Sequence, residues 1–276
     1  MDRLLLIDGS NLLFQMYFGM PARIVGSNGI AIHGTLGFVG ALLKMIRMVQ
    51  ADHVAVLFDG EHENPRTALD ADYKANRPEE ERDTPFSQLP DIYRALDFLG
   101  LCHAETVDCE TDDWIAGYVR RYGGECEIVI ASMDSDFFQL IAPTVRVLRY
   151  RGKGSVVCDE AYIREKFGIE PWQYAGFKSL TGDRADNIPG VPGVGAKTAA
   201  LLMREFGSLG GVLAHSDRIA KPSARASVTE NTGRIGCNYR LIALDGVVDL
   251  PFSVSQLRWK DPGMTTVQVL RGIGVY

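Results

Sequence analysis

Two acidic side chains precede a glycine-rich turn in the stretch 179–199, and this combination is the feature of the sequence best suited to chemistry. Asp183 and Asp186 lie three residues apart, and Gly190, Gly193 and Gly195 follow them. Carboxylate oxygens are ligands for hard divalent cations, and the amide groups at the start of a helix attract anions. One segment therefore offers metal ligands beside a place for a phosphate, which indicates cleavage of a phosphodiester.

The turn itself suits contact with a nucleic-acid backbone. Apolar residues recur at helical spacing from 196 to 206, so the turn should open a helix. A charge and a hydroxyl in its first turn could meet a phosphate, whereas nothing there could read base edges. The residues expected to bind DNA are Gly190, Gly193, Gly195, Lys197 and Thr198. A plain loop between two core helices is the alternative, since short glycine motifs are hypotheses only.

Three predicted strands each end next to an aspartate. The apolar runs 4–7, 53–58 and 127–131 are typical of buried strands, and the helical patterns between them predict a parallel α/β sheet. The carboxyl ends of parallel strands share one edge, so the acidic residues there should converge. These residues are Asp8, Asp59, Asp134 and Asp136. A turn or a helix cap could explain any one of them, but massed carboxylates repel unless a cation joins them.

Two further segments carry charge. Glu110, Asp112 and Asp113 precede a helix whose apolar residues recur at helical spacing from 115 to 122. The helix dipole alone could favour these carboxylates, although the spacing also presents two or three of them to the strand ends. The segment 61–88 is highly charged and long for a plain connection, so it is either a solvated loop or functional. The stretch 221–232 is polar without a clear period and is predicted to be a loop.

Composition bounds the class of protein. The 276 residues are 46% hydrophobic and 23% charged, which suits one large or two modest globular domains. A net charge of −6 argues against a broadly basic coat but not against DNA, because bound cations would neutralise clustered carboxylates. The five cysteines form no C-x-x-C pair, and no apolar run approaches about 18 residues. We expect a soluble, cytoplasmic protein with reduced thiols and no membrane association.

The ordered motifs resemble those of the 5′-nuclease superfamily, which includes the 5′-3′ exonuclease domain of bacterial DNA polymerase I, its stand-alone relatives and flap endonucleases. The resemblance covers essentially the whole chain and is strongest at the segments 7–11, 58–60, 73–78, 110–113, 134–136 and 182–187. It implies an α/β fold with a central, mostly parallel sheet flanked by helices. It also implies a nuclease core over 1–180, a helical arch at about 61–90, and a helix-three-turn-helix DNA-binding region over 181–276.

The resemblance also implies roles for individual residues. Two Mg²⁺ or Mn²⁺ ions are expected. The ligands of the first would be Asp8, Asp59, Glu110, Asp112, Asp113 and Asp134, and those of the second Asp136, Asp183 and Asp186. Lys74 and Arg77 match basic positions of the arch, where Lys74 would contact the scissile phosphate. The turn at 190–199 would grip duplex DNA and hold a potassium ion through main-chain carbonyls.

The function expected from this resemblance is structure-specific hydrolysis of DNA with 5′ ends, flaps or gaps, by a monomer using two metal ions. Polymerase-linked relatives usually carry an arginine where this chain has Gln15. That departure is the sequence support for an alternative, a structure-specific DNA-binding protein without useful catalysis. An RNA-directed nuclease of the related PIN-like type would need no helix-three-turn-helix, so the turn favours DNA.

Overall fold

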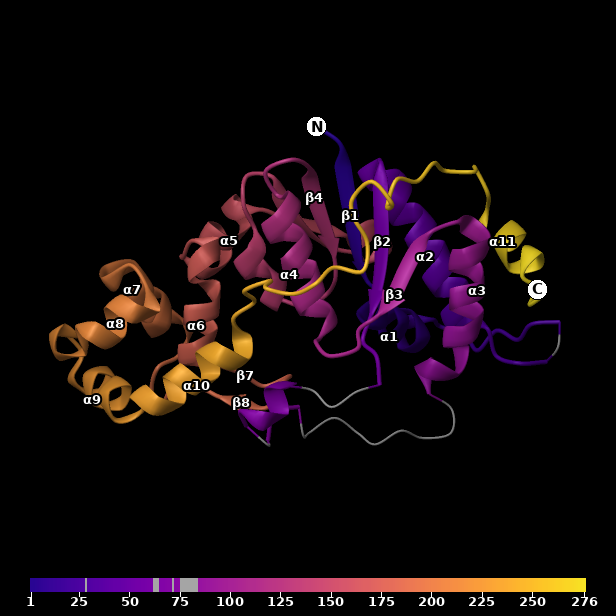
Figure 1. The fold of residues 1–276 in the computed structure, drawn as a ribbon. Coiled ribbons are helices and arrows are strands. Elements are labelled where there is room, and N and C mark those ends of the chain that lie inside the picture. The colour runs from indigo at the N-terminus through magenta and orange to yellow at the C-terminus, as the bar shows by residue number, and fades with distance from the viewer. Residues whose placement is uncertain (28, 62–64, 71, 75–83) are drawn as a thin grey trace.

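A six-stranded sheet in the order β3-β2-β1-β4-β5-β6 forms the centre of the protein (Figure 1). The computed structural model describes residues 1–27, 29–61, 65–70, 72–74 and 84–276. Within this sheet β6 pairs antiparallel with β5, and the other four ladders are parallel. The predicted fold class, an α/β fold with a mostly parallel sheet, is confirmed. The strands are β1 Arg3–Asp8, β2 His53–Phe58, β3 Cys102–Glu105, β4 Glu127–Ala131, β5 Val145–Arg149 and β6 Val156–Cys158.

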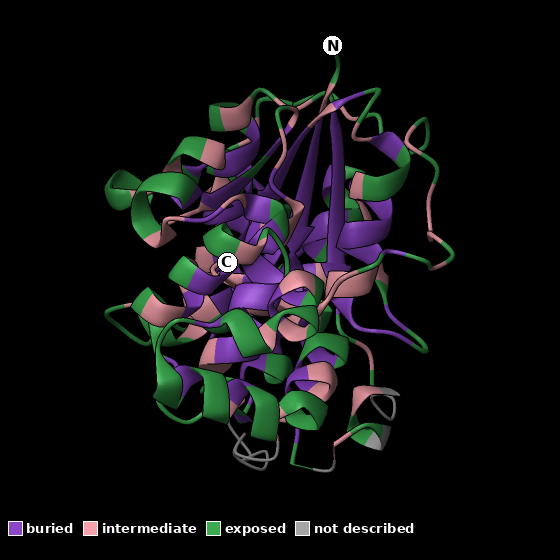
Figure 2. Cartoon of the chain, turned by 90° about the vertical axis from the view of Figure 1, so that its left-hand side faces the viewer, coloured by how far each residue is buried: buried purple, intermediate pink, exposed green. Residues whose placement is uncertain are grey.

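Both faces of the sheet are buried, which explains why its strands are continuous apolar runs. Successive side chains of a strand point to opposite faces. In β1, Leu4 and Leu6 therefore join one hydrophobic core, while Leu5 and Ile7 join the other. Figure 2 shows the strands as buried ribbon enclosed by helices whose outer surfaces are exposed.

Helices cover the two faces of the sheet. One core includes side chains of α1, α2, α3 and α11, and the other includes side chains of α4, α5 and α6. Their bounds are α1 Gly9–Gly19, α2 His33–Val49, α3 Leu89–Leu99, α4 Thr111–Tyr122, α5 Glu160–Phe167, α6 Tyr174–Thr181 and α11 Thr266–Gly272. The helix predicted from the apolar residues between 115 and 122 corresponds to α4.

Four helices beyond α6 gather at one end of the molecule (Figure 1). They are α7 Ala196–Phe206, α8 Leu209–Ala214, α9 Pro222–Glu230 and α10 Thr232–Ile242. The prediction of a loop over 221–232 was wrong, because α9 occupies most of it. Pro222 starts that helix, and its buried side chains, Ala224 and Val228, are too few to produce a visible period. After α10 the chain returns along the sheet, and α11 packs against α2 and α3.

A short antiparallel hairpin, β7 Gly182–Asp183 and β8 Ile188–Pro189, joins α6 to the glycine-rich turn. It lies beside the 3-10 helix Pro65–Ala68, at the end of the sheet near α1 (Figure 1). The hairpin therefore places its carboxylates near the carboxyl ends of the strands. None of the described helices is long and apolar enough to cross a membrane.

Candidate metal and DNA site

The carboxyl ends of β1 and β4 bring acidic side chains together. Asp8 ends β1, is 5% exposed and caps α1 by accepting a 3.0 Å hydrogen bond from the Asn11 amide. Its other oxygen accepts a 2.8 Å bond from the Ser132 hydroxyl, and that hydroxyl accepts a 3.0 Å bond from the Asp134 amide. Ser132 thus connects the aspartates that follow two neighbouring strands.

Several of these carboxylates are close enough for their charges to act on one another. Burial, followed by the charge of Asp59, raises the pKa of Asp8 to about 7. Burial and then the charges of Asp134 and Asp8 raise the pKa of Asp112 well above its usual value. Each carboxylate makes its neighbours harder to ionise, so the group gains by holding a cation. The structure therefore brings together Asp8, Asp59, Asp112 and Asp134.

The remaining acidic residues of α4 already have cationic partners. The Arg66 guanidinium pairs with Asp113 at 2.7 Å and also with Glu110, which in turn pairs with the Lys74 ammonium. The second Asp113 oxygen accepts a 3.1 Å bond from the Glu110 amide, closing a capping box at the start of α4. Asp113 therefore stabilises the helix as well as adding charge to the site, as the dipole argument anticipated.

A second group of carboxylates lies beside the first. Oxygens of Asp136, Asp183 and Asp186 lie within 4.8 Å of one another, close enough to hold one metal ion. The Asp136 amide donates a 2.8 Å bond to Asp134, so the two groups adjoin. Asp183 is oriented locally, because it accepts a 2.8 Å bond from the Ala185 amide inside the hairpin.

Lys178 is a member of this second group that the sequence analysis missed. Its ammonium, on α6, pairs with both Asp136 and Asp183, and its side chain is only 8% exposed. Burial opposes the charge of this lysine, but the two aspartates outweigh it and raise its pKa. Burial also raises the pKa of Asp136 to about 7, although Lys178 acts against that rise. The available signal in the sequence was a lysine within the mostly apolar stretch 174–180.

The glycine-rich turn approaches α6 closely and then opens α7. A Cβ on Gly190 would lie 2.3 Å from the Thr181 carbonyl oxygen, so this close contact of two backbones requires glycine. Gly193 has φ of +73°, in the left-handed region. Among the described residues, no side chain caps α7 at Gly195, and Lys197 is exposed in its first turn. Amide groups and a positive charge therefore face outward together, as an anion site requires.

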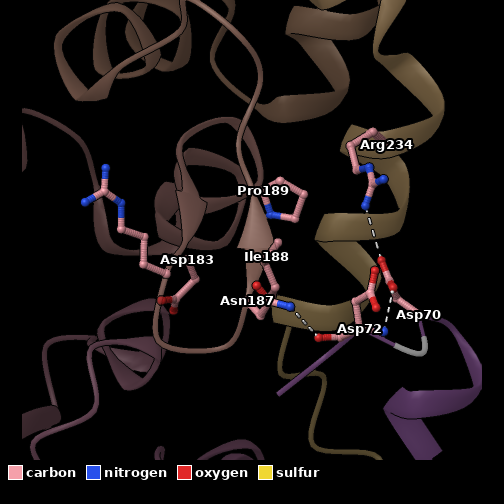
Figure 3. A pocket seen from close by; sticks show the side chains of 8 residues that line it. Asp70, Asp72, Asp183, Asn187, Ile188, Pro189 and Arg234 are labelled. Carbon is pink, nitrogen blue, oxygen red and sulfur yellow. Dashed lines mark hydrogen bonds and ion pairs between the residues drawn. The ribbon is translucent and has the colours of Figure 1, made fainter. Parts of the chain in front are cut away.

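A pocket of about 300 Å³ lies where the hairpin meets Asp70 and Asp72 (Figure 3). Asp183 is on one side of it and Asp70 on the other, with Arg234 of α10 above Asp70. Lys74 is the last described residue before residue 84. Arg77, predicted to face the same DNA, lies outside the described residues.

Two adjoining acidic groups lie at one edge of the sheet, and a glycine-rich turn leads from there into the four helices α7 to α10. These features define a metal-binding α/β protein of the class that the sequence resembles. Two family models divide the chain between them. Residues 3–168 match the "5′-3′ exonuclease, N-terminal resolvase-like domain", and residues 169–265 match the "5′-3′ exonuclease, C-terminal SAM fold". The chain belongs to the 5′-3′ exonuclease family.

Individual relatives and solved structures are also similar to this chain. A 5′-3′ exonuclease of Streptomyces coelicolor is 35% identical over 82% of this chain and 78% of its own length. The thermostable DNA polymerase I of Thermus thermophilus is 33% identical over 95% of this chain, which spans 31% of that polymerase. Among solved structures, T5 5′-exonuclease with bound zinc has a TM-score of 0.73 at 22% identity, covering 88% of this chain and 90% of its own. The catalytic core of Rad2 with a DNA substrate has a TM-score of 0.64 at 15% identity, covering 99% and 86%.

Proposed function

We propose that this chain is a structure-specific 5′ nuclease that hydrolyses DNA phosphodiester bonds with the help of two divalent metal ions. The observation that carries the proposal is the contact between the two acidic groups, where the Asp136 amide bonds to the Asp134 carboxylate at 2.8 Å. Each of the adjoining groups would hold one divalent cation. Membership of the 5′-3′ exonuclease family supports the same activity.

The donor set suits Mg²⁺ or Mn²⁺, because both prefer carboxylate oxygens. The first ion would be held by residues among Asp8, Asp59, Glu110, Asp112, Asp113 and Asp134, and the second by Asp136, Asp183 and Asp186. When bound, two such ions supply an activated water and stabilise the leaving oxyanion. Burial and the charge of Asp59 raise the pKa of Asp8, so a bound cation would favour the ionised form of that carboxyl.

The chain's own cations have separate tasks in this proposal. Lys74, and Arg77 with it, offset the charge of the approaching phosphate, while Lys197 and Thr198 hold the duplex backbone at the start of α7. Carbonyls of the turn at 190–199 would hold a potassium ion there. We propose DNA with 5′ ends, flaps or gaps as the substrate and a monomer as the active form. A DNA substrate in the Rad2 complex is consistent with such a partner.

The test is cleavage of a 5′-flap duplex, a gapped duplex and a blunt duplex in Mg²⁺, with the products sized. We expect Asp183→Asn to slow cleavage by at least about a thousandfold, because the second metal loses a ligand. DNA binding in Ca²⁺ should stay within about threefold, since the turn is untouched. Asp217→Asn, at an exposed aspartate of the distant helical lobe, is the matched control and should cleave normally.

The same assay tests the alternative function, a structure-specific DNA-binding protein without useful catalysis. Gln15 donates a 2.6 Å hydrogen bond to the Tyr150 carbonyl, so this side chain is used inside the fold. A wild-type protein that bound flaps tightly but left them uncut in both Mg²⁺ and Mn²⁺ would favour a DNA-binding protein.

A further inference from the structure

Asp70, Asp72 and Lys74 are each anchored to the C-terminal part of the chain. Asp70 pairs with Arg234 of α10 at 3.2 Å, and the Asp72 carbonyl accepts a 2.9 Å bond from the Asn187 side-chain amide (Figure 3). The Lys74 amide then donates a 3.0 Å bond to the Asp186 carbonyl. Two of these three anchors come from the β7–β8 hairpin, which also carries the candidate ligands Asp183 and Asp186.

The Tyr73 side chain holds residues 72–74 by further contacts. Its ring is 5% exposed and packs against Ile188 of the hairpin and Leu241 of α10, in a small core of its own. Its hydroxyl bonds to Glu110 at 3.3 Å, and the Lys74 ammonium lies 4.9 Å from the centre of its ring. The contacts of residues 72–74 with the hairpin therefore set the direction of the Lys74 side chain.

Backbone strain is concentrated at this contact. Among the described residues, only three that are not glycine have positive φ, and two of them meet here, Lys74 at +56° and Asn187 at +58°. A left-handed conformation costs a lysine about 1 kcal/mol or more, whereas asparagine tolerates it better. Such strain persists where surrounding contacts enforce it, and here the Asn187 amide and the Asp186 carbonyl do so.

We propose that Asn187 is a positioning residue that fixes Lys74 for its contact with the DNA phosphate. This inference rests on the proposed function of Lys74. The Asn187 side-chain amide donates a hydrogen bond to the Asp72 carbonyl. This contact keeps the Lys74 amide on the Asp186 carbonyl and the Lys74 ammonium beside Glu110. The hairpin that holds the second metal thereby also sets the position of the phosphate-binding lysine.

The test variant is Asn187→Gly, because glycine accepts the positive φ while removing the amide. We expect hydrogen exchange of the Lys74 amide to become at least tenfold faster. We also expect kcat on a 5′ flap to fall at least tenfold with KM within about twofold, while Mn²⁺ binding stays within about twofold. The double variant with Lys74→Ala should be no slower than Lys74→Ala alone, since both changes act through one side chain.

Gln50→Gly is the matched control, because Gln50 also has positive φ, at +54°, and ends α2. It should change neither Lys74 exchange nor kcat. Unchanged Lys74 exchange in Asn187→Gly, unchanged kcat, or a loss of Mn²⁺ binding would each overturn the inference. Failure of the proposed function is distinguishable, because it would appear as absent cleavage by the wild-type protein, whereas Lys74 exchange is measured without any reaction.

Discussion

Replacing Lys178 by methionine tests how charge is balanced in the second acidic group. The methionine keeps a long, flexible apolar stem but removes the ammonium that pairs with Asp136 and Asp183. Those side chains are 10% and 15% exposed, so water can compensate little. Removing one partner of a buried ion pair costs about 3 to 5 kcal/mol, because the other charge is left uncompensated. In EDTA we therefore expect Tm to fall by on the order of 6 to 10 °C.

A divalent cation should reverse this loss. In the wild-type protein an ion entering the group of Asp136, Asp183 and Asp186 meets the Lys178 ammonium, which repels it and occupies two of the same carboxylates. Without that ammonium, Mn²⁺ should bind at least about tenfold more tightly, equivalent to about 1.4 kcal/mol. Saturating Mg²⁺ should then restore most of the lost Tm, since the bound ion replaces the missing charge.

The assays are differential scanning fluorimetry in EDTA and in Mg²⁺, and titration of free Mn²⁺ by electron paramagnetic resonance. Lys166→Met is the matched control, because Lys166 lies exposed on the neighbouring α5. It should change neither Tm nor Mn²⁺ affinity. An Mn²⁺ affinity that stays the same or falls in Lys178→Met, or a Tm that Mg²⁺ does not recover, would refute the account of Lys178 as a resident counter-ion.

Three further predictions concern the pH dependence of stability, DNA binding and a backbone contact. Because burial raises the pKa of Asp8 from 3.8 to about 7, the folded state is favoured below pH 4 by this group and loses that contribution as pH rises through 7. The lost contribution to stability is on the order of 4 kcal/mol for one such carboxyl. Because Mg²⁺ binds the ionised carboxylate, it should raise Tm more at pH 7.5 than at pH 5.5, and an equal rise at both pH values would contradict this prediction. Lys197→Ala should weaken duplex binding and reduce the slope of log affinity against log salt by about 1, as measured by fluorescence anisotropy; an unchanged slope would count against a phosphate contact there. Gly190→Ala should lower the free energy of unfolding by more than about 1 kcal/mol in a urea titration, because its Cβ would lie 2.3 Å from the Thr181 carbonyl; a neutral result would mean that the turn can shift.

The sequence determined the sheet and its acidic edge, because both depend on local patterns. The runs at 53–58 and 127–131 match β2 and β4, since strands buried on both faces are continuous in apolar residues. Aspartates that follow such strands must share an edge when the strands are parallel, and this rule predicts that Asp8 and Asp134 lie together. The helix at 196–206 was equally clear, because its apolar period is regular.

Short or weakly apolar elements depended on tertiary packing. The strand β3, Cys102–Glu105, is four residues long and only partly buried, so no apolar run announces it. It forms because β2 offers a parallel edge to pair with. Similarly, α9 is held by Ala224 and Val228 in a shared core. Local sequence contains neither partner.

The charges that balance the acidic edge were also decided only in three dimensions. Arg66, Lys74 and Lys178 come from three separate segments. Arg66 and Lys74 pair with carboxylates at the start of α4, and Lys178 pairs with Asp136 and with Asp183 of β7. Sequence spacing could count the negative charges but could not say which cations would be buried among them. Ion pairing inside a protein depends on distance and exposure, and folding alone fixes both.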